Sequence, residues 1–266
     1  MSMRLNWTRQ QRKQKQIERN KMRQIKIEVL FEDLEIVVCR KPAGIATQSA
    51  RCGQQDMVSL LKNARAAKGE EPYVGLLHRL DQPVEGVMVF AKTKQAAAAL
   101  SRQVASRGID KCYLAVVQGK LAEDAGNLEH YLMRDGKTNL SRVASQGEPE
   151  AKLARLSYQV LAYDKARDAS LVRIKLDTGR HHQIRVQMSA IGHPLLGDQK
   201  YHAAAGSGEA AMNRQTPPGR LGREMVALCS HKIGFVHPVT KKQMEYAILP
   251  QNPLFQGFDM TSTLDN

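Results

Sequence analysis

The sequence lacks the features of a membrane protein or a disulfide-stabilised protein. It has only four cysteines in 266 residues, and no two of them form a Cys-x-x-Cys pair. That number is too small for a disulfide framework, and the spacing does not fit a structural zinc site. No apolar run approaches the length of a transmembrane helix, and no apolar segment follows the basic N-terminus as in a secretory signal. The composition therefore predicts a soluble protein of a reducing cytoplasm.

Acidic residues are scarce relative to basic ones. The chain has 40 Lys and Arg against 26 Asp and Glu, which gives a formal net charge of +14. Residues 1–26 hold nine of the basic residues and only one acidic residue, Glu18. This clustering favours a polyanionic partner, because binding to phosphates releases counterions. We interpret residues 1–26 as a basic N-terminal extension, either bound to nucleic acid or idle, and residues 27–266 as one domain.

From residue 27 the sequence shows the alternating and continuous apolar runs that are typical of β-strands. Strands are expected at 27–31, 34–39, 86–91, 109–117, 156–160 and 171–176, with further strand-like segments within 230–249. Thr93 predicts the cap of a helix that ends near residue 106, and a second helix follows Gly179. Residues 203–223 have the composition of a long surface insertion. Strands outnumber helices and follow one another in hairpin-like succession, so the expected fold class is α+β.

Two short stretches place charged side chains where a loop meets an apolar element. The first is His78-Arg79-Leu80-Asp81-Gln82-Pro83-Val84-Glu85-Gly86, and the second is Gly179-Arg180-His181-His182-Gln183-Ile184-Arg185-Val186. A carboxylate at such a junction is held by the scaffold and remains open to a substrate. Together the two stretches resemble the signature motifs of the RluA-type pseudouridine synthases, which isomerise uridine in RNA.

Three further segments extend this resemblance. They are Lys41-Pro42-Ala43-Gly44, Lys111-Cys112-Tyr113-Leu114-Ala115, and the run from Ile191 to Tyr201. Five ordered landmarks are far more specific than any one of them, since short motifs recur by chance. The resemblance implies a mixed, largely antiparallel central sheet with flanking helices, a catalytic cleft across its middle and no cofactor.

The expected chemistry needs one carboxylate beside the sugar of the target nucleotide. Isomerisation breaks the C1′–N1 bond, turns the base and forms a C1′–C5 bond. A carboxylate can attack C1′ or remove a sugar proton to give a glycal-like intermediate. Asp81 matches the family's catalytic aspartate. On spacing alone, an aspartate that caps its own turn would be the more common interpretation.

Two other residues match the family's active site. Arg185 matches the basic residue that pairs with the catalytic carboxylate and keeps it ionised and oriented. Tyr113 matches the active-site tyrosine, whose phenol can stack on uracil and form a hydrogen bond. Without the resemblance, Arg185 would be interpreted as a helix-surface arginine and Tyr113 as a core tyrosine.

Five residues near the motifs are expected to contact RNA, and none is expected to hold a metal. Arg79 matches the residue that can enter the helix when the target nucleotide flips out. The others are His78, which also structures its loop, and Lys111, Arg180 and His181. His181, His182 and His193 lie near one another in the sequence. They lack a companion carboxylate at ligand spacing, so no metal site is expected.

The sequence departs from the commoner family pattern at two places and leaves two rival functions open. Val84-Glu85 replaces Thr-Ser in the first motif, which puts a second negative charge near the expected phosphate path, and His181 replaces a Thr. One rival is a non-catalytic RNA-binding or ribosome-assembly protein. The other is a nucleoside or glycoside hydrolase, which needs a second catalytic acid or a metal cluster. We expect a monomer that acts on ribosomal or transfer RNA.

Overall fold

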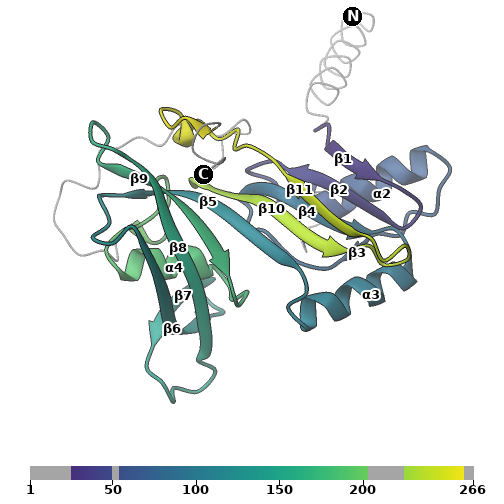
Figure 1. Cartoon of the computed structure of the whole chain (residues 1–266). Helices are drawn as coiled ribbons and strands as arrows, with labels where there is room; N and C mark the ends of the chain where they lie inside the picture. Colours follow the sequence, from purple (N-terminus) through teal and green to yellow (C-terminus); the bar gives the residue numbers. More distant parts are fainter. Residues whose placement is uncertain (1–24, 50–53, 203–224, 261–266) are drawn as a thin grey trace, which may run out of the picture.

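The computed structural model describes residues 25–49, 54–202 and 225–260. One mixed sheet of eleven strands runs through these residues, and three helices pack on it (Figure 1). Residues 1–24, most of the expected basic extension, lie outside the described residues, and so does the expected insertion at 203–223. No helix within the described ranges is long and apolar enough to cross a membrane.

The strand order is β1-β2-β4-β10-β5-β9-β8-β6-β7, with β3 paired to β4 and β11 paired to β10. The bounds of these strands are β1 Glu28–Glu32, β2 Ile36–Lys41, β3 Gly75–Leu76, β4 Glu85–Ala91, β5 Asp110–Gln118, β6 Ala125–Asp135, β7 Leu140–Ala144, β8 Lys152–Asp164, β9 Ala169–Leu176, β10 Leu228–Val236 and β11 Gln243–Ala247. Each of these strand pairs is antiparallel except β4 with β10, which is parallel. The expected α+β class with a largely antiparallel mixed sheet is confirmed.

Helices α2 and α3 begin where the sequence supplies capping side chains. Helix α2 (Met57–Ala67) starts with a capping box between Asp56 and Ser59, and α3 (Lys94–Ala105) starts at Thr93, whose hydroxyl accepts from the Ala96 amide. These side chains satisfy amides that would otherwise lack a partner. The expected Thr93 cap is therefore confirmed. The short helix α4 (Gln183–Ala190) follows the second motif, and a 3-10 helix, η3 (Pro253–Phe255), lies near the end of the described chain.

The two faces of the sheet bury different helices. On one face Tyr113, Ala115 and Val117 of β5 join a core with residues of α2 and α4. On the other face Leu114 and Val116 join a core with residues of α3. Successive strand residues point to opposite faces, so this alternation identifies the side to which any residue of β5 belongs. We call the side of Tyr113 and α4 the front face and the side of Leu114 and α3 the reverse face.

Gly86 allows the one parallel contact between these strands. It pairs with Ser230 across β4 and β10. A Cβ added at Gly86 would lie 2.4 Å from the Ser230 Cβ, and the φ of Gly86 is +153°. No side chain fits at that distance, so any other residue would separate the two strands. Because β4 begins directly after the first motif, Gly86 determines how that motif joins the sheet.

Candidate active site

Asp81 lies in the loop between β3 and β4, and its side chain is 29% exposed. The loop is held from below by Lys41, the last residue of β2. The buried Lys41 ammonium donates to the carbonyls of Pro42, Gln82 and Val84 at 3.1, 3.2 and 2.6 Å. Two of these carbonyls follow Asp81 closely in the sequence. A buried ammonium surrounded by carbonyls therefore fixes the backbone on which the carboxylate stands.

The loop that follows β2 adds further contacts to the Asp81 loop. Thr47 Oγ1 donates to the Leu80 carbonyl at 2.8 Å and accepts from the Leu80 amide at 3.1 Å. The Gly44 amide donates to the Gln82 carbonyl, and the Gln82 side-chain amide donates back to the Gly44 carbonyl. The Lys41-Pro42-Ala43-Gly44 segment thus acts as a support for the first motif. Such support keeps a reactive side chain in one geometry.

Arg185 brings the second motif to Asp81. It projects from α4, is 1% exposed, and its Nη1 lies 3.4 Å from Asp81 Oδ2. Its main partner, however, is Asp198, which accepts from Nε at 2.6 Å and from Nη2 at 2.7 Å. The expected pairing of Arg185 with Asp81 is therefore present but long, and the close bidentate pair is formed with a buried carboxylate that the sequence interpretation did not assign.

Asp198 and Tyr201 hold the guanidinium in a fixed plane. Two parallel N–H···O bonds to one carboxylate define that plane, and the Arg185 Cζ also lies 5.1 Å from the centre of the Tyr201 ring. Burial tends to lower the pKa of Arg185, but the hydrogen bonds and charge of Asp198 outweigh it, so the pKa rises. Both residues belong to the run Gly197-Asp198-Gln199-Lys200-Tyr201, to which the family resemblance gave no role.

His182 is the second side chain that reaches Asp81. Its Nε2 lies 3.5 Å from Asp81 Oδ2, and its Nδ1 lies 2.6 Å from the Tyr201 hydroxyl. That hydroxyl also accepts from the Ser141 amide. In the tautomer that carries its proton on Nε2, the ring directs an N–H toward Asp81 and accepts from the Tyr201 hydroxyl at Nδ1. Burial, followed by the charge of Arg185, lowers the pKa of His182 to about 2, so the ring is neutral.

Tyr113 lies on the front face of β5, as its position in the strand predicts, and is 6% exposed. Ser230 lies opposite it on β10. Burial, reinforced by the negative charge of Asp81, raises the pKa of the phenol above its ordinary value. The phenol therefore stays protonated and lies within the electrostatic reach of the Asp81 carboxylate.

A basic groove adjoins these residues. A cavity of about 420 Å³ is lined by residues of β6, β7 and β8 and by the start of the second motif, including Arg134, Lys152, Arg180 and His181. His181 stacks on His182 with ring centres 3.8 Å apart, and its Nδ1 lies 2.8 Å from Ser141 Oγ. The groove therefore continues directly from the side chains that surround Asp81. Arg180 is exposed, and its Nε donates to the Leu153 carbonyl.

The remaining expected RNA contacts are not all on this surface. Arg79 is exposed beside Asp81 in the sequence, as its expected role requires. His78 is 8% exposed, and its Nε2 lies 3.5 Å from the Val89 amide of β4. Burial, followed by the charge of Lys111, lowers the pKa of His78 to about 3. The neutral ring is enclosed by the fold, and the expected contact of His78 with RNA stays a prediction. Lys111 lines a different cavity.

Glu85 does not lie on a phosphate path. It is 3% exposed, and its Oε1 accepts from the backbone amides of Gln251 and Asn252 at 3.0 and 2.9 Å. Burial raises its pKa, while those amides and the charges of Arg40 and Lys41 oppose the shift. The expectation that Glu85 adds a charge near the substrate is therefore corrected, because its carboxylate joins the start of β4 to the C-terminal segment.

The histidines do not form a metal site. His193 Nδ1 lies 2.8 Å from the Gln118 carbonyl, whereas His181 and His182 contact Ser141 and Tyr201. Throughout the part of the chain that the structure describes, no three His, Cys, Asp or Glu residues lie close enough to hold a metal ion.

Comparison with known proteins gives a consistent result. The sequence profile described as RNA pseudouridylate synthase matches residues 35–190. A Bacillus subtilis protein named uncharacterized RNA pseudouridine synthase YhcT is 35% identical over 215 residues, which are 80% of this chain and 65% of that protein. The chain thus spans just under two thirds of that relative. The ribosomal large subunit pseudouridine synthase D of Zymomonas mobilis is 33% identical over 240 residues, which are 88% of this chain and 72% of the relative.

A solved structure shares the fold. The human protein titled RNA pseudouridylate synthase domain containing 1 aligns with a TM-score of 0.65 and 24% identity, over 85% of this chain and 84% of the other. At that identity the similarity describes the fold alone. It agrees with the mixed, largely antiparallel sheet seen here.

Proposed function

The chain belongs to the RNA pseudouridylate synthase family, and from that premise we propose that it isomerises uridine in RNA with Asp81 as the catalytic carboxylate. The observation that supports this most directly is the convergence of two distant motifs on one oxygen. Arg185 and His182 both approach Asp81 Oδ2, at 3.4 and 3.5 Å. Neither contact involves Oδ1, so the carboxylate is oriented by one oxygen and can present the other to the sugar.

Two routes from Asp81 are consistent with this geometry. In one, the carboxylate attacks C1′ and N1 leaves with the bonding pair; C5 of the turned base then displaces the carboxylate. In the other, the carboxylate removes the C2′ proton as N1 leaves; C5 then bonds to C1′ of the glycal-like intermediate while the carboxylic acid returns the proton to C2′. In both, C5 loses its hydrogen after the new bond forms. Deuterium at C2′ slows only the second route, so its effect on the rate separates them.

Tyr113 and Arg185 have distinct proposed roles. The protonated Tyr113 phenol lies on the front face near Asp81, where it can stack on the uracil ring and donate a hydrogen bond. Arg185 is locked by Asp198, so its remaining Nη1 group can orient the Asp81 carboxylate without moving. A fixed donor costs no reorganisation during the reaction, which is the usual advantage of a preorganised site.

RNA binding is proposed for the basic groove beside Asp81. Arg134, Lys152, Arg180 and His181 line it, and Arg79 is exposed next to the catalytic loop. Lysine and arginine at such a site contact phosphates and fix the register of the RNA. Large-subunit ribosomal RNA is our first candidate substrate, because several relatives are named for the large ribosomal subunit; transfer RNA is the second. A monomer in the cytoplasm remains part of the proposal.

One assay distinguishes the proposed function from its rivals. RNA carrying tritium at C5 of uridine releases the label to water when C5 bonds to C1′. A hydrolase would instead release labelled uracil, and a binding protein would release neither. The hydrolase is disfavoured on structural grounds, since Glu85 is engaged by backbone amides and Asp198 by Arg185. Absence of tritium release from both RNA classes, with intact binding, would overturn the proposed function.

A further inference from the structure

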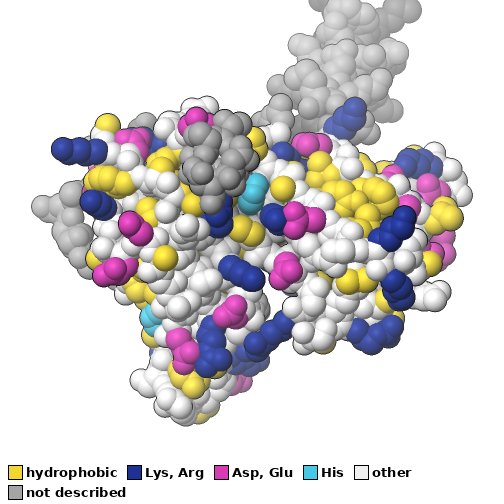
Figure 2. Space-filling view, in the orientation of Figure 1, with side chains coloured by type: hydrophobic (Ala, Val, Ile, Leu, Met, Phe, Trp, Pro, Cys, Tyr) yellow, Lys and Arg dark blue, Asp and Glu magenta, His cyan; other side chains and the backbone are white. Residues whose placement is uncertain are grey.

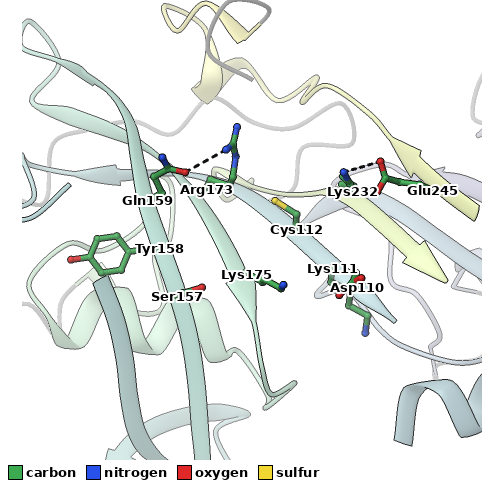
Figure 3. A pocket seen from close by; sticks show the side chains of 10 residues that line it. All are labelled: Asp110, Lys111, Cys112, Ser157, Tyr158, Gln159, Arg173, Lys175, Lys232 and Glu245. Atoms are coloured by element: carbon green, nitrogen blue, oxygen red, sulfur yellow. Dashed lines mark hydrogen bonds and ion pairs between the residues drawn. The ribbon is translucent and has the colours of Figure 1, made fainter. Parts of the chain in front are cut away.

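The reverse face of the sheet carries a second cavity, which the proposed reaction does not use. It measures about 400 Å³ and is lined by residues of β5, β8, β9, β10 and β11 (Figure 3). Cys112 lies at its centre, on the same face as Leu114 and opposite to Tyr113. In Figure 3 Cys112, Arg173 and Lys232 stand in front of the strands and α4 lies behind them, whereas Tyr158 packs against the front-face core. We call this cavity the reverse-face pocket.

Three cations surround Cys112 in adjacent rows of the sheet. Lys232 on β10 and Lys175 on β9 are the two cross-strand neighbours of Cys112. Arg173 lies in the next row, opposite Leu114. Neighbouring strands are about 4.8 Å apart, so the two lysines flank the thiol at roughly 10 Å from each other at the backbone. Gln159 on β8 accepts from Arg173 Nη1 at 3.3 Å and holds the guanidinium at the rim.

The pKa of the Cys112 thiol reflects the three cations around it. Burial raises the pKa of Cys112, and the charges of Arg173, Lys232 and Lys175 act against that shift. Like charges that share one sheet face destabilise each other, and a bound anion would relieve that repulsion. In the space-filling view, lysine and arginine side chains lie along the middle of this face, interspersed with aspartate and glutamate side chains (Figure 2).

We propose that the reverse-face pocket binds the phosphate backbone of a second segment of the RNA whose uridine is modified on the front face. The proposal rests on the proposed function for the identity of the polyanion. A cavity of this size accommodates a nucleotide unit, and three cations around it match the charge of the phosphate backbone. The contact adds affinity and orientation without reading the base sequence.

Two carboxylates also line the pocket, and neither opposes an anion strongly. Glu245 pairs with Lys232 at 2.7 Å, but the two side chains are 58% and 41% exposed. An exposed pair of this kind contributes little to stability, so Lys232 can exchange it for a phosphate. Asp110 is exposed at the rim. An ordinary solvated sheet face is the alternative that the experiment must exclude.

The position of the pocket determines the experiment. Because it lies across the sheet from Asp81, a short RNA that fills the front-face site does not reach it, whereas a long folded RNA can contact both. The probes are a short oligouridine and an unmodified transcript of large-subunit ribosomal RNA. The test variant is Lys175→Glu with Lys232→Glu. The matched control reverses the charge of two exposed lysines that lie outside both cavities, Lys94→Glu with Lys165→Glu.

The expected result is specific to the long RNA. The test variant should bind the transcript about tenfold more weakly at low salt, and the slope of log affinity against log salt should fall by about 1.4, because two fewer phosphates are neutralised. Binding of the oligouridine should stay within about twofold. An equal loss of affinity in the control variant, or no loss in the test variant, would overturn the proposal.

Cys112 provides a second, local readout. Cys39 and Cys229 are buried, so among the described cysteines Cys112 is the accessible one. The transcript should protect Cys112 from alkylation by iodoacetamide, the oligouridine should not, and the test variant should lose the protection. Tight binding of the transcript without protection would also overturn the proposal. Asp81→Asn should keep the protection while losing tritium release, so failure of the pocket and failure of the proposed reaction give different results.

Discussion

At the scale of single residues, the site depends on how one guanidinium is shared between two carboxylates. Arg185 is bound tightly to Asp198 at 2.6 and 2.7 Å and loosely to Asp81 at 3.4 Å. Charge-assisted bonds are strong at the first distance and weak at the second. Asp198 therefore serves to position Arg185, and Asp81 keeps enough freedom to approach the sugar.

Asp81→Asn should abolish isomerisation and preserve RNA binding. The substitution keeps the shape of the side chain but removes the negative oxygen that both routes require. We expect the single-turnover rate of tritium release to fall by at least about a thousandfold, or about 4 kcal/mol of barrier. RNA affinity should change by no more than a few-fold. A purified variant that reacts near the wild-type rate would remove Asp81 from the mechanism.

Asp198→Asn should destabilise the protein as well as impair the reaction. Both carboxylate oxygens of Asp198 pair with Arg185, and its side chain is fully buried. Because the asparagine amide has no negative charge, the buried guanidinium of Arg185 would lose its charged partner. Such a loss lowers the free energy of unfolding by about 3–5 kcal/mol. Urea denaturation measures the loss of stability. Asp177→Asn, at an exposed aspartate, is the matched control and should change the free energy of unfolding by less than about 0.5 kcal/mol.

A double variant tests the reason for that loss of stability. If the unpaired charge is the cause, Asp198→Asn with Arg185→Met should be more stable than Asp198→Asn alone, since no buried cation remains. Its activity should stay low, because Arg185 no longer orients Asp81. Equal stability of the single and double variants would show that the packing of Asp198, and not the charge of Arg185, dominates.

At the scale of secondary-structure elements, β2 supports the catalytic loop through a single buried lysine. Burial lowers the pKa of Lys41 from 10.5 to about 7, while Asp81 and Glu85 oppose the shift. Between these two pH values the unfolded chain binds more protons at this position than the folded chain does. The contribution of Lys41 to the free energy of unfolding therefore rises with pH across that range, by up to about 1.4 kcal/mol per pH unit.

Lys41→Met should remove this pH dependence. The free energy of unfolding of the wild type, minus that of the variant, should increase from pH 7 to pH 9, because only the wild type has the shifted lysine. Urea denaturation of both proteins at several pH values checks this. A difference that stays constant, or that shrinks as the pH rises, would contradict the buried-lysine account.

Glu85 connects β4 to the C-terminal segment, so its replacement should affect stability more than chemistry. Glu85→Ala leaves two amides, of Gln251 and Asn252, without an acceptor. We expect a decrease of about 2–5 kcal/mol in the free energy of unfolding. Glu123→Ala, at an exposed glutamate, is the control. A Glu85→Ala protein that is fully folded but has lost most of its kcat would indicate a direct catalytic role instead.

Local patterns predicted some elements well and others not at all. Thr93 and the apolar run before it identified α3 and β4, because a capping side chain and a buried strand leave local signals. Helix α2 and strands β6 and β7 were not predicted. The side chains of β6 alternate only between half-buried and exposed along most of its length, so its apolar period is weak. Asp198 and Arg185 meet only in the folded chain, and the family resemblance alone drew attention to the segment of Asp198.

At the scale of the whole molecule, the two motifs meet because the sheet is bent around its centre. The Asp81 loop precedes β4 in one half of the sheet, and α4 packs in the other half, beyond β5 and β10 (Figure 1). The residues of neither motif predict that the two motifs contact each other. The separation of front and reverse faces likewise follows from strand register and not from composition, so the reverse-face pocket was not predictable from the sequence.

The distribution of charge gives the last prediction. Residues 1–26 carry a net charge of +8 out of +14, and residues 1–24 lie outside the described residues. If the extension binds phosphates, deleting residues 1–26 should weaken RNA binding and reduce the salt slope by about 0.7 for each phosphate that is no longer neutralised. The modified position should stay the same, because phosphate binding does not read sequence. A full-length chain with Gln at the nine basic positions is the matched control and should behave like the deletion. An unchanged slope in both would show that the extension is idle, and a weakening confined to the deletion would assign its effect to packing and not to charge.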